Sequence, residues 1–138
     1  MKSKKFFLYT DGGSRGNPGP SGIGVVILDS KRKKVKETCK YIGETTNNVA
    51  EYSALILGLE EALALEADEV TVYMDSELLA KQLNGEYRVK DESIRPLFEK
   101  TLGILKNFRA FEIKHIAREK NSQADKLANK AINLAGLF

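Results

Sequence analysis

The chain has 138 residues, of which 42% are hydrophobic and 30% charged, and this composition is typical of a soluble globular protein. We expect one domain that spans residues 1–138, and no apolar run approaches the length needed to cross a membrane. The formal net charge of +3 is compatible with a polyanionic partner but does not require one. The single cysteine, Cys39, excludes an internal disulfide. With no signal-peptide-like run at the start, it favours a cytoplasmic location.

The first feature along the chain is a short apolar run that leads to an aspartate. Phe6–Tyr9 predicts a buried strand, which we expect to end at Asp11. The following residues, 12–22, are rich in glycine and proline, and they predict a tight loop. An Asp-Gly pair is most often a plain turn signal. Here it also places a carboxylate at a strand end, beside a loop that other groups can approach closely.

Two further strands are expected next, at Ile23–Leu28 and Val35–Ile42. So few residues separate them that they must be antiparallel neighbours. The residues at the connection are mostly basic, and we interpret this run as a solvated hairpin end rather than a binding site. They are Lys31, Arg32, Lys33, Lys34 and Lys36.

A helix is predicted from Val49 to about Leu65, because apolar residues recur there at helical spacing. The preceding residues, Thr45–Asn48, are helix-capping types, and Glu51 falls in the expected first turn. The next strand, Val70–Met74, follows a helix and should therefore run parallel to an earlier strand. It is followed directly by Asp75.

The remainder of the chain continues the alternation of helices and strands. Ser76 is a plausible cap for a short helix over 77–83, and a second helix is expected from Ile94 to about Leu105. The alternating run Phe111–Ile116 predicts a fifth strand. In the last helix, Asp125 occupies the first turn.

Four carboxylates therefore stand at the ends of elements: Asp11 and Asp75 after strands, and Glu51 and Asp125 in first helical turns. If the first and fourth strands are parallel neighbours, their aspartates lie side by side at the edge where ligand sites of α/β sheets collect. Clustered carboxylates repel one another unless they are protonated or bound to cations, and all-oxygen ligand sets favour Mg²⁺ or Mn²⁺. Two such ions roughly 3.5–4 Å apart are a standard arrangement for phosphodiester hydrolysis. Each carboxylate alone is more often structural, but the set of four favours a metal site.

Four segments resemble the signature segments of ribonuclease H type 1, and the resemblance covers nearly the whole chain in the same order and spacing. They are Thr10–Gly19, Thr45–Tyr52, Met74–Glu77 and Arg118–Ala128. The resemblance implies an α/β, RNase H-like fold with a five-stranded mixed sheet in the order 3-2-1-4-5, flanked by helices. It also implies endonucleolytic hydrolysis of the RNA strand of RNA–DNA hybrids, which leaves 5′-phosphate and 3′-hydroxyl ends.

The resemblance assigns metal-binding and catalytic roles to the four carboxylates, with two Mg²⁺ or Mn²⁺ ions per site when substrate is bound. Asp11 would bridge both ions. Asp125 would complete the site of the ion that activates the attacking water. Glu51 and Asp75 would hold the ion that stabilises the leaving 3′-oxygen, and Glu51 would also contact a 2′-hydroxyl.

The same resemblance assigns seven residues to substrate binding: Gly12, Gly13, Asn17, Thr46, Asn47, Asn48 and Ser76. The three asparagines match positions that line the minor groove of the hybrid, and Thr46 matches a contact to a DNA phosphate. RNA differs from DNA by its 2′-hydroxyl, which is exposed in a wide, shallow minor groove. Short amides on a glycine-rich segment and at a helix start can reach that groove.

The chain departs from many relatives in its basic groups. Gly85–Lys90 leads directly to the next helix, where many bacterial relatives carry an extra basic helix and loop. A separate amino-terminal hybrid-binding module is also not expected. Substrate affinity would then depend on scattered groups such as Arg15, Arg88 and Lys90. We expect a monomer with no obligate protein partner.

Many relatives also place a histidine on a mobile loop before the last helix. An ungapped count from Asp125 arrives at His115, but its place in the alternating run predicts a packed strand residue. The loop itself, Ala117–Asn121, carries Arg118. An arginine can stabilise charge on the scissile phosphate although it cannot transfer a proton. We therefore favour Arg118 as the catalytic group, and His115 stays the alternative.

Two other functions fit parts of the pattern. A nuclease of the same fold could act on double-stranded RNA or DNA junctions, but it would lack the Thr-Asn-Asn run at 46–48. A nucleic-acid-binding protein without catalysis would have no use for four clustered carboxylates, because uncompensated negative charge repels phosphates.

Overall fold

The computed structural model describes residues 4–137, so the ends of the expected domain, residues 1–3 and 138, lie outside the described part. The elements are β1 (Lys5–Ser14), β2 (Gly19–Leu28), β3 (Lys34–Thr45), α1 (Asn47–Ala64), β4 (Glu69–Met74), α2 (Glu77–Leu83), α3 (Arg95–Leu105), β5 (Ala110–His115), the 3-10 helix η1 (Arg118–Asn121) and α4 (Ser122–Ala135). No helix among these is both long and apolar enough to cross a membrane.

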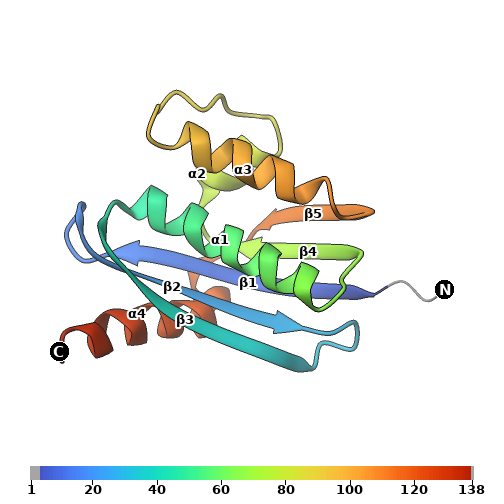
Figure 1. Ribbon diagram of the computed structural model, residues 1–138, viewed down its shortest axis with the longest axis horizontal. Coiled ribbons are helices and arrows are strands. Elements are labelled where there is room, and N and C mark those ends of the chain that lie inside the picture. Colours follow the sequence, from blue (N-terminus) through green and yellow to red (C-terminus); the bar gives the residue numbers. More distant parts are fainter. Residues whose placement is uncertain (1–3, 138) are drawn as a thin grey trace.

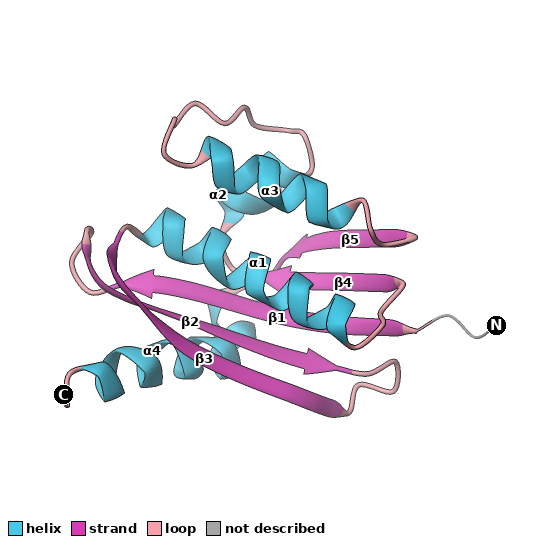
Figure 2. Cartoon of the chain, viewed as in Figure 1, coloured by secondary structure: helices cyan, strands magenta, loops and turns pink. Residues whose placement is uncertain are grey.

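The five strands form one mixed sheet in the order β3-β2-β1-β4-β5, as predicted. β1, β2 and β3 are antiparallel neighbours, whereas β4 pairs with β1, and β5 with β4, in parallel. Helices α1 and α3 lie on one side of the sheet and α4 lies on the other (Figure 1, Figure 2). This is the α/β arrangement with helices on both faces that the sequence implied.

The main core lies between α1 and the sheet. Leu8 of β1 and Val25 of β2 are fully buried on that face, as are Leu55 and Leu59 of α1. Tyr52 is also fully buried, and its hydroxyl lies 2.6 Å from Oε1 of Gln82 on α2. The apolar stripe of α1 therefore fixes the helix against the strand that carries Asp11.

The predicted loop over residues 12–22 is too long, because β1 continues to Ser14 and β2 begins at Gly19, which leaves only residues 15–18 in the turn. Gly12 and Gly24 lie in the strands at points where helices approach the sheet, whereas Gly16 stays in the turn with a φ of 78°. A Cβ on Gly12 would collide with the backbone of Ala50 in α1, and one on Gly24 would collide with the carbonyl oxygen of Ala124 in α4. Glycine is required here by close packing rather than by a turn.

The first turn of α1 also differs from the prediction. β3 extends to Thr45, and Thr46 caps the helix by accepting a hydrogen bond from the Val49 backbone nitrogen at 3.3 Å. The helix therefore begins at Asn47, so that Glu51 lies beyond the first turn. Its position is consequently set by packing against β1 and not by attraction to the helix N-terminus.

The later elements follow the prediction closely, with one correction. Ser76 caps α2 by accepting from the Leu79 backbone nitrogen at 3.3 Å, and residues 84–94 join α2 to α3 through turns. His115 lies in β5, as expected, but it is the last residue of that strand and is exposed rather than packed. β5 is an edge strand, and of its six residues only Ile113 is buried.

Candidate active site

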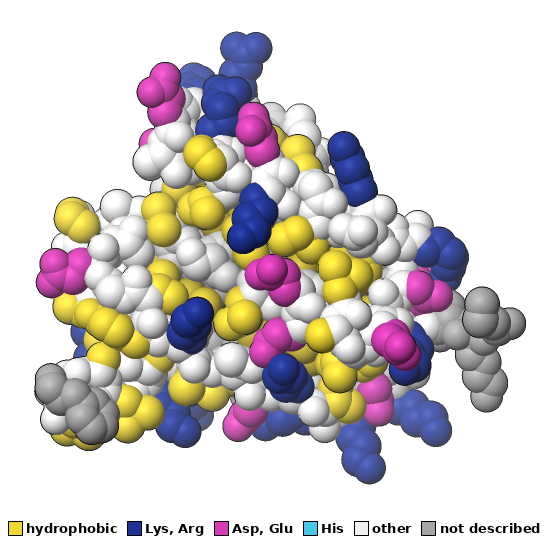
Figure 3. All heavy atoms as spheres, in the orientation of Figure 1, with side chains coloured by type: hydrophobic (Ala, Val, Ile, Leu, Met, Phe, Trp, Pro, Cys, Tyr) yellow, Lys and Arg dark blue, Asp and Glu magenta, His cyan; other side chains and the backbone are white. Residues whose placement is uncertain are grey.

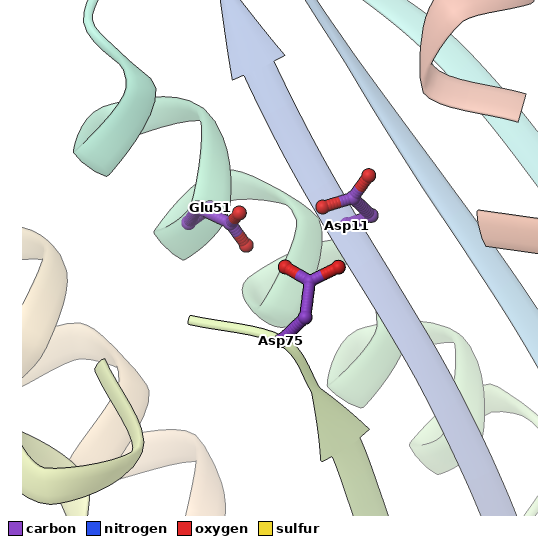
Figure 4. A group of neighbouring side chains, drawn as sticks. All are labelled: Asp11, Glu51 and Asp75. Atoms are coloured by element: carbon purple, nitrogen blue, oxygen red, sulfur yellow. The ribbon is translucent and has the colours of Figure 1, made fainter. Parts of the chain in front are cut away.

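Three carboxylates meet where β4 ends beside β1. Tyr9 pairs with Tyr73 in the parallel register, so Asp11 and Asp75, two residues further along each chain, lie level with each other. Glu51 reaches the same place from α1, and one oxygen from each carboxylate lies within 4.8 Å of the others. Figure 4 shows the three side chains pointing toward one another.

The cluster is strongly coupled electrostatically. Burial, the charge of Asp75 and the neighbouring Asp125, in that order of importance, together raise the pKa of Asp11 from its ordinary value to about 8. Burial also raises the pKa of Glu51 well above its ordinary value, with Asp11 and Asp75 adding to the shift. In the absence of a cation, the site therefore favours protonated carboxyl groups at neutral pH.

Asp125 stands beside this cluster on α4. It is in the first turn of that helix, as predicted, and its carboxyl group is a hydrogen-bond neighbour of Asp11. Asp125 does not belong to the compact group of three, but all four carboxylates line one cavity of about 420 Å³. Asp11 thus lies between the pair Glu51 and Asp75 on one side and Asp125 on the other.

The donor set fits divalent cations. Within residues 4–137, none of the four carboxylates forms an ion pair with a lysine or arginine within 4.0 Å. Buried carboxylates without a basic partner need either protons or metal ions to offset their repulsion. Oxygen donors of this kind suit Mg²⁺ and Mn²⁺. The residues present are therefore suited to hold such ions.

Sequence reasoning missed two asparagines that support the carboxylates. Asn121 is 1% exposed, and its Nδ2 donates to the Thr10 carbonyl oxygen at 2.9 Å and lies 3.4 Å from Asp75 Oδ2. Asn129 lies one helical turn beyond Asp125, and its Nδ2 donates to the Asp125 carbonyl oxygen at 3.0 Å. Asn121 and Asn129 each lie four residues from Asp125, and this helical spacing was the signal in the sequence that could have indicated both residues.

Arg118 and His115 are placed differently. Arg118 begins η1 and lines the cavity together with the four carboxylates. His115 does not line that cavity and lies near Glu77 at the start of α2, whose pKa it slightly lowers after the larger effect of Lys81. Of the two, only Arg118 is placed to face a group bound in the cavity.

The predicted substrate residues divide into two groups. Gly12, Gly13 and Asn47 line the cavity, as does Arg15, whereas Asn17, Thr46, Asn48 and Ser76 do not. Asn17 nevertheless lies close, because its Oδ1 accepts a hydrogen bond from the Asn47 backbone nitrogen at 3.0 Å. The Asn47 side chain in turn accepts from the Ser14 backbone nitrogen at 2.8 Å. These contacts tie the β1–β2 turn to the start of α1.

Arg88 and Lys90 lie away from the carboxylates. They line a separate cavity of about 540 Å³ between α2, the 84–94 segment and α3, which Tyr87 and Arg95 also line. They are therefore candidates for contacts to a substrate that extends beyond the site, and not for contacts at the cluster itself.

Comparisons with known proteins agree with this geometry. The family model described as "Reverse transcriptase-like" matches residues 9–131. The bifunctional protein Rv2228c of Mycobacterium tuberculosis is 41% identical over 132 residues, which cover 95% of this chain but 36% of that protein. This chain therefore spans about a third of the length of that relative.

Two further matches are ribonucleases by name. Ribonuclease HI of Halobacterium salinarum is 40% identical over 125 residues, covering 91% of this chain and 63% of that protein. The crystal structure of LC11-RNase H1 in complex with an RNA/DNA hybrid aligns with a TM-score of 0.89 and 49% identity. That alignment covers 94% of this chain and 98% of the solved one.

Proposed function

Because the chain belongs to the ribonuclease H type 1 family, we propose that it is an endoribonuclease that hydrolyses the RNA strand of RNA–DNA hybrids. The products would carry 5′-phosphate and 3′-hydroxyl ends. The observation that carries the proposal is the group of Asp11, Glu51 and Asp75, with Asp125 on the same cavity. A binding protein would not maintain four carboxylates without basic partners at a surface meant for phosphates.

We propose two divalent cations, Mg²⁺ or Mn²⁺, as cofactors of the bound complex. Asp11 is flanked by carboxylates on both sides and is suited to be the shared ligand, with Asp125 on one ion and Glu51 and Asp75 on the other. When bound, such ions lower the pKa of the attacking water and stabilise charge on the leaving oxygen. The protein contributes the spacing of the carboxylates. It also contributes a buried environment without basic partners, in which cations are needed to offset the repulsion between the carboxylates.

Selection of RNA is proposed to come from groups at the rim of the cavity. Glu51 can accept a hydrogen bond from a 2′-hydroxyl, which DNA lacks. Asn47 lines the cavity, and Asn17 is fixed to it by a hydrogen bond, so both amides are held near the groove of a bound duplex. Thr46 and Ser76, whose hydroxyls cap helices, would contact phosphates at those helix starts.

Arg118 is proposed to stabilise charge on the scissile phosphate. Its guanidinium belongs to the exposed first residue of η1, so it can move toward a phosphate without disturbing the core. Arginine stays protonated at working pH and donates in a planar fork that matches phosphate oxygens.

The test is cleavage of matched duplexes with one strand labelled. We expect cleavage of the RNA–DNA hybrid with Mg²⁺ or Mn²⁺, no cleavage of double-stranded DNA, and resistance of a hybrid with 2′-deoxy sugars around the cut site. Asp75→Asn should reduce turnover by a factor on the order of 10³. Glu60→Gln, an exposed carboxylate on α1, serves as the matched control.

Two outcomes would contradict the proposal. Equal cutting of double-stranded DNA would favour a resolvase-type nuclease, which is the main alternative. Hybrid binding without cleavage under any divalent cation would favour a non-catalytic binding protein.

A further inference from the structure

In the described part of the chain, residues 4–137, half of one face of the sheet has no helix over it. Ala124, in the first turn of α4, lies against Gly24 of β2, and later residues of α4 lie against Gly22. The helix therefore runs away from Val26 and Leu28, the following residues of β2 on the same face. In Figure 1, α4 lies behind one half of the sheet, and the half toward the β2–β3 turn has no helix behind it.

Three aromatic rings lie on this bare half, and we call Phe7, Tyr9 and Tyr73 the aromatic strip. The rings of Tyr9 and Tyr73 are stacked with centroids 4.8 Å apart, and those of Phe7 and Tyr73 with centroids 6.2 Å apart. Phe7 is buried, and Tyr9 and Tyr73 are half-buried, so the two tyrosines provide the accessible ring surface of the strip. Arg32 covers the far end, with its Cζ 4.0 Å from the centre of the Phe7 ring and its Nη2 3.4 Å from the Tyr73 hydroxyl.

Most of the charges around the aromatic strip are positive, and Asp29 and Glu119 are the acidic residues of the same turn and of η1. Within residues 4–137, the cations beside it form no ion pair with a carboxylate within 4.0 Å. They are Lys5 and Arg32, with Lys31 and Lys33 in the same turn as Arg32, and Lys120 on η1. The acidic side chains on neighbouring strands are neutralised instead: Glu37 by Lys34, Glu69 by Arg109 and Glu112 by Lys114.

The opposite face has a different character. The surface in Figure 3 mixes acidic and basic side chains over α1 and the adjoining strands. Lysine and arginine side chains project at the lower right of that view, which is the end of the molecule where β2 turns into β3. The basic turn is therefore next to the bare half of the sheet.

The aromatic strip leads directly to the carboxylate cluster. Tyr9 and Tyr73 lie two residues before Asp11 and Asp75, so each shares the face of its strand with the carboxylate. The distance along β1 from Asp11 to Phe7 is about 13 Å at 3.3 Å per residue. A single strand of about four stacked nucleotides, at about 3.4 Å per base, has the same length.

A small cavity lies between the aromatic strip and the start of α4. It has a volume of about 180 Å³ and is lined by Tyr9, Val26 and Leu28 on the sheet side and by Lys120, Ser122 and Gln123 on the helix side. The phenol ring and aliphatic residues offer an apolar surface to a planar base. The Gln123 amide can donate to and accept from a base edge, and the Lys120 ammonium can pair with a phosphate.

We propose that the aromatic strip, with Arg32 and Lys120, binds single-stranded nucleic acid that continues from the hybrid beyond the active site. Aromatic rings beside a positively charged track are the usual device for binding single strands without sequence preference. The charge complementarity selects a polyanion, and the rings select one with exposed bases. The inference rests on the proposed function, because it takes the strand at the active site to be a hybrid strand.

The test measures binding by fluorescence anisotropy without divalent cations, so that it does not depend on cleavage. The probes are a blunt hybrid and the same hybrid with a single-stranded RNA extension of about six nucleotides at the 5′ or the 3′ end. We expect one extension to tighten wild-type binding by roughly 5–100-fold, the range for stacking one base on an aromatic side chain. Arg32→Ala and Tyr73→Ser should each remove most of that gain and leave binding of the blunt hybrid unchanged.

Matched controls come from elsewhere on the surface. Tyr41→Ser removes an exposed aromatic ring from β3, and Lys106→Ala removes an exposed cation after α3; neither should affect the gain. Cleavage of the blunt hybrid by the same variants tests the proposed function separately. Equal wild-type affinity for blunt and extended hybrids would overturn the inference. So would an equal loss for both probes in the Arg32 and Tyr73 variants.

Discussion

Replacing Asp11 with asparagine is expected to abolish cleavage and, in the absence of divalent cations, to stabilise the folded protein. Asparagine has the shape of the protonated aspartate but cannot ionise, so it removes the central charge of the cluster. Loss of a metal ligand should lower turnover by a factor on the order of 10³ or more. The gain in stability follows because Asp11 is 7% exposed and is crowded by Glu51, Asp75 and Asp125.

The size of the gain follows from the pKa of Asp11, which rises from 3.8 to about 8 in the folded protein. At pH values between these two, the folded protein holds a proton that the unfolded chain has released. The free energy of unfolding therefore falls as the pH rises from about 4 to about 8. At about 1.36 kcal/mol per pKa unit, ionisation in the unfolded chain lowers stability by about 2 kcal/mol at pH 5 and about 4 kcal/mol at pH 7.

Urea denaturation in a chelating buffer, followed by circular dichroism at pH 5 and pH 7, measures this effect. Asp11 should contribute about 2–3 kcal/mol to the stability that wild type loses between the two pH values, and the loss in Asp11→Asn should be smaller by about that amount. The raised pKa of Glu51 adds its own loss in both proteins. Added Mg²⁺ should restore wild-type stability at pH 7 and have a smaller effect on the variant. Glu60→Gln, with its exposed carboxyl group, should follow wild type. Equal stability of wild type and Asp11→Asn at pH 7 without metal would refute the reasoning.

Three other changes test the site and its support. Arg118→Ala should lower turnover roughly 10–1000-fold while the exposed His115→Ala changes it little; the opposite result in steady-state kinetics would make His115 the functional group. Asn121→Ala should lower the free energy of unfolding by about 1–3 kcal/mol, because its buried amide bonds the Thr10 carbonyl; an unchanged urea midpoint would contradict this. Gly24→Ala should cost about 1–3 kcal/mol by thermal unfolding, because its Cβ meets the α4 backbone, whereas Gly103→Ala, with open space around it, should be neutral or stabilising.

Much of the fold could be predicted because local signals agreed with it. Ser76 is both the residue after a strand-end aspartate and a good helix cap, and α2 begins one residue later, as predicted. The helix before β4 predicted that β4 runs parallel to an earlier strand, and the family resemblance implied that this strand is β1. The pairing brings Asp11 and Asp75 together. Where local preference and long-range packing require the same residue, the sequence alone is sufficient to predict the structure at that position.

The errors arose where long-range packing determined the residue. Gly12 and Gly22 looked like loop residues because glycine is common in turns, yet each is required by a helix that lies far away in sequence. His115 lies in an alternating pattern that predicts a packed side chain. Its strand is at the edge of the sheet, however, and only Ile113 of that strand is buried. Asn121 was not predicted because a single asparagine before a helix is a common cap, and its role depends on the distant Thr10 carbonyl.

The continuation of β1 beyond Asp11 has a consequence for motion at the site. Asp11 pairs with Gly24 inside the ladder between β1 and β2, and that ladder extends to Ser14 and Ser21. The main chain at this carboxylate is therefore held along the strand, and its amide should exchange with solvent slowly. Asp75, by contrast, follows the last residue of β4, and Asp125 lies on a helix entered through a single 3-10 turn. If the spacing of the bound ions changes during a turnover, we expect the segments around 75–76 and 116–122 to move, while β1 stays in place as the fixed reference.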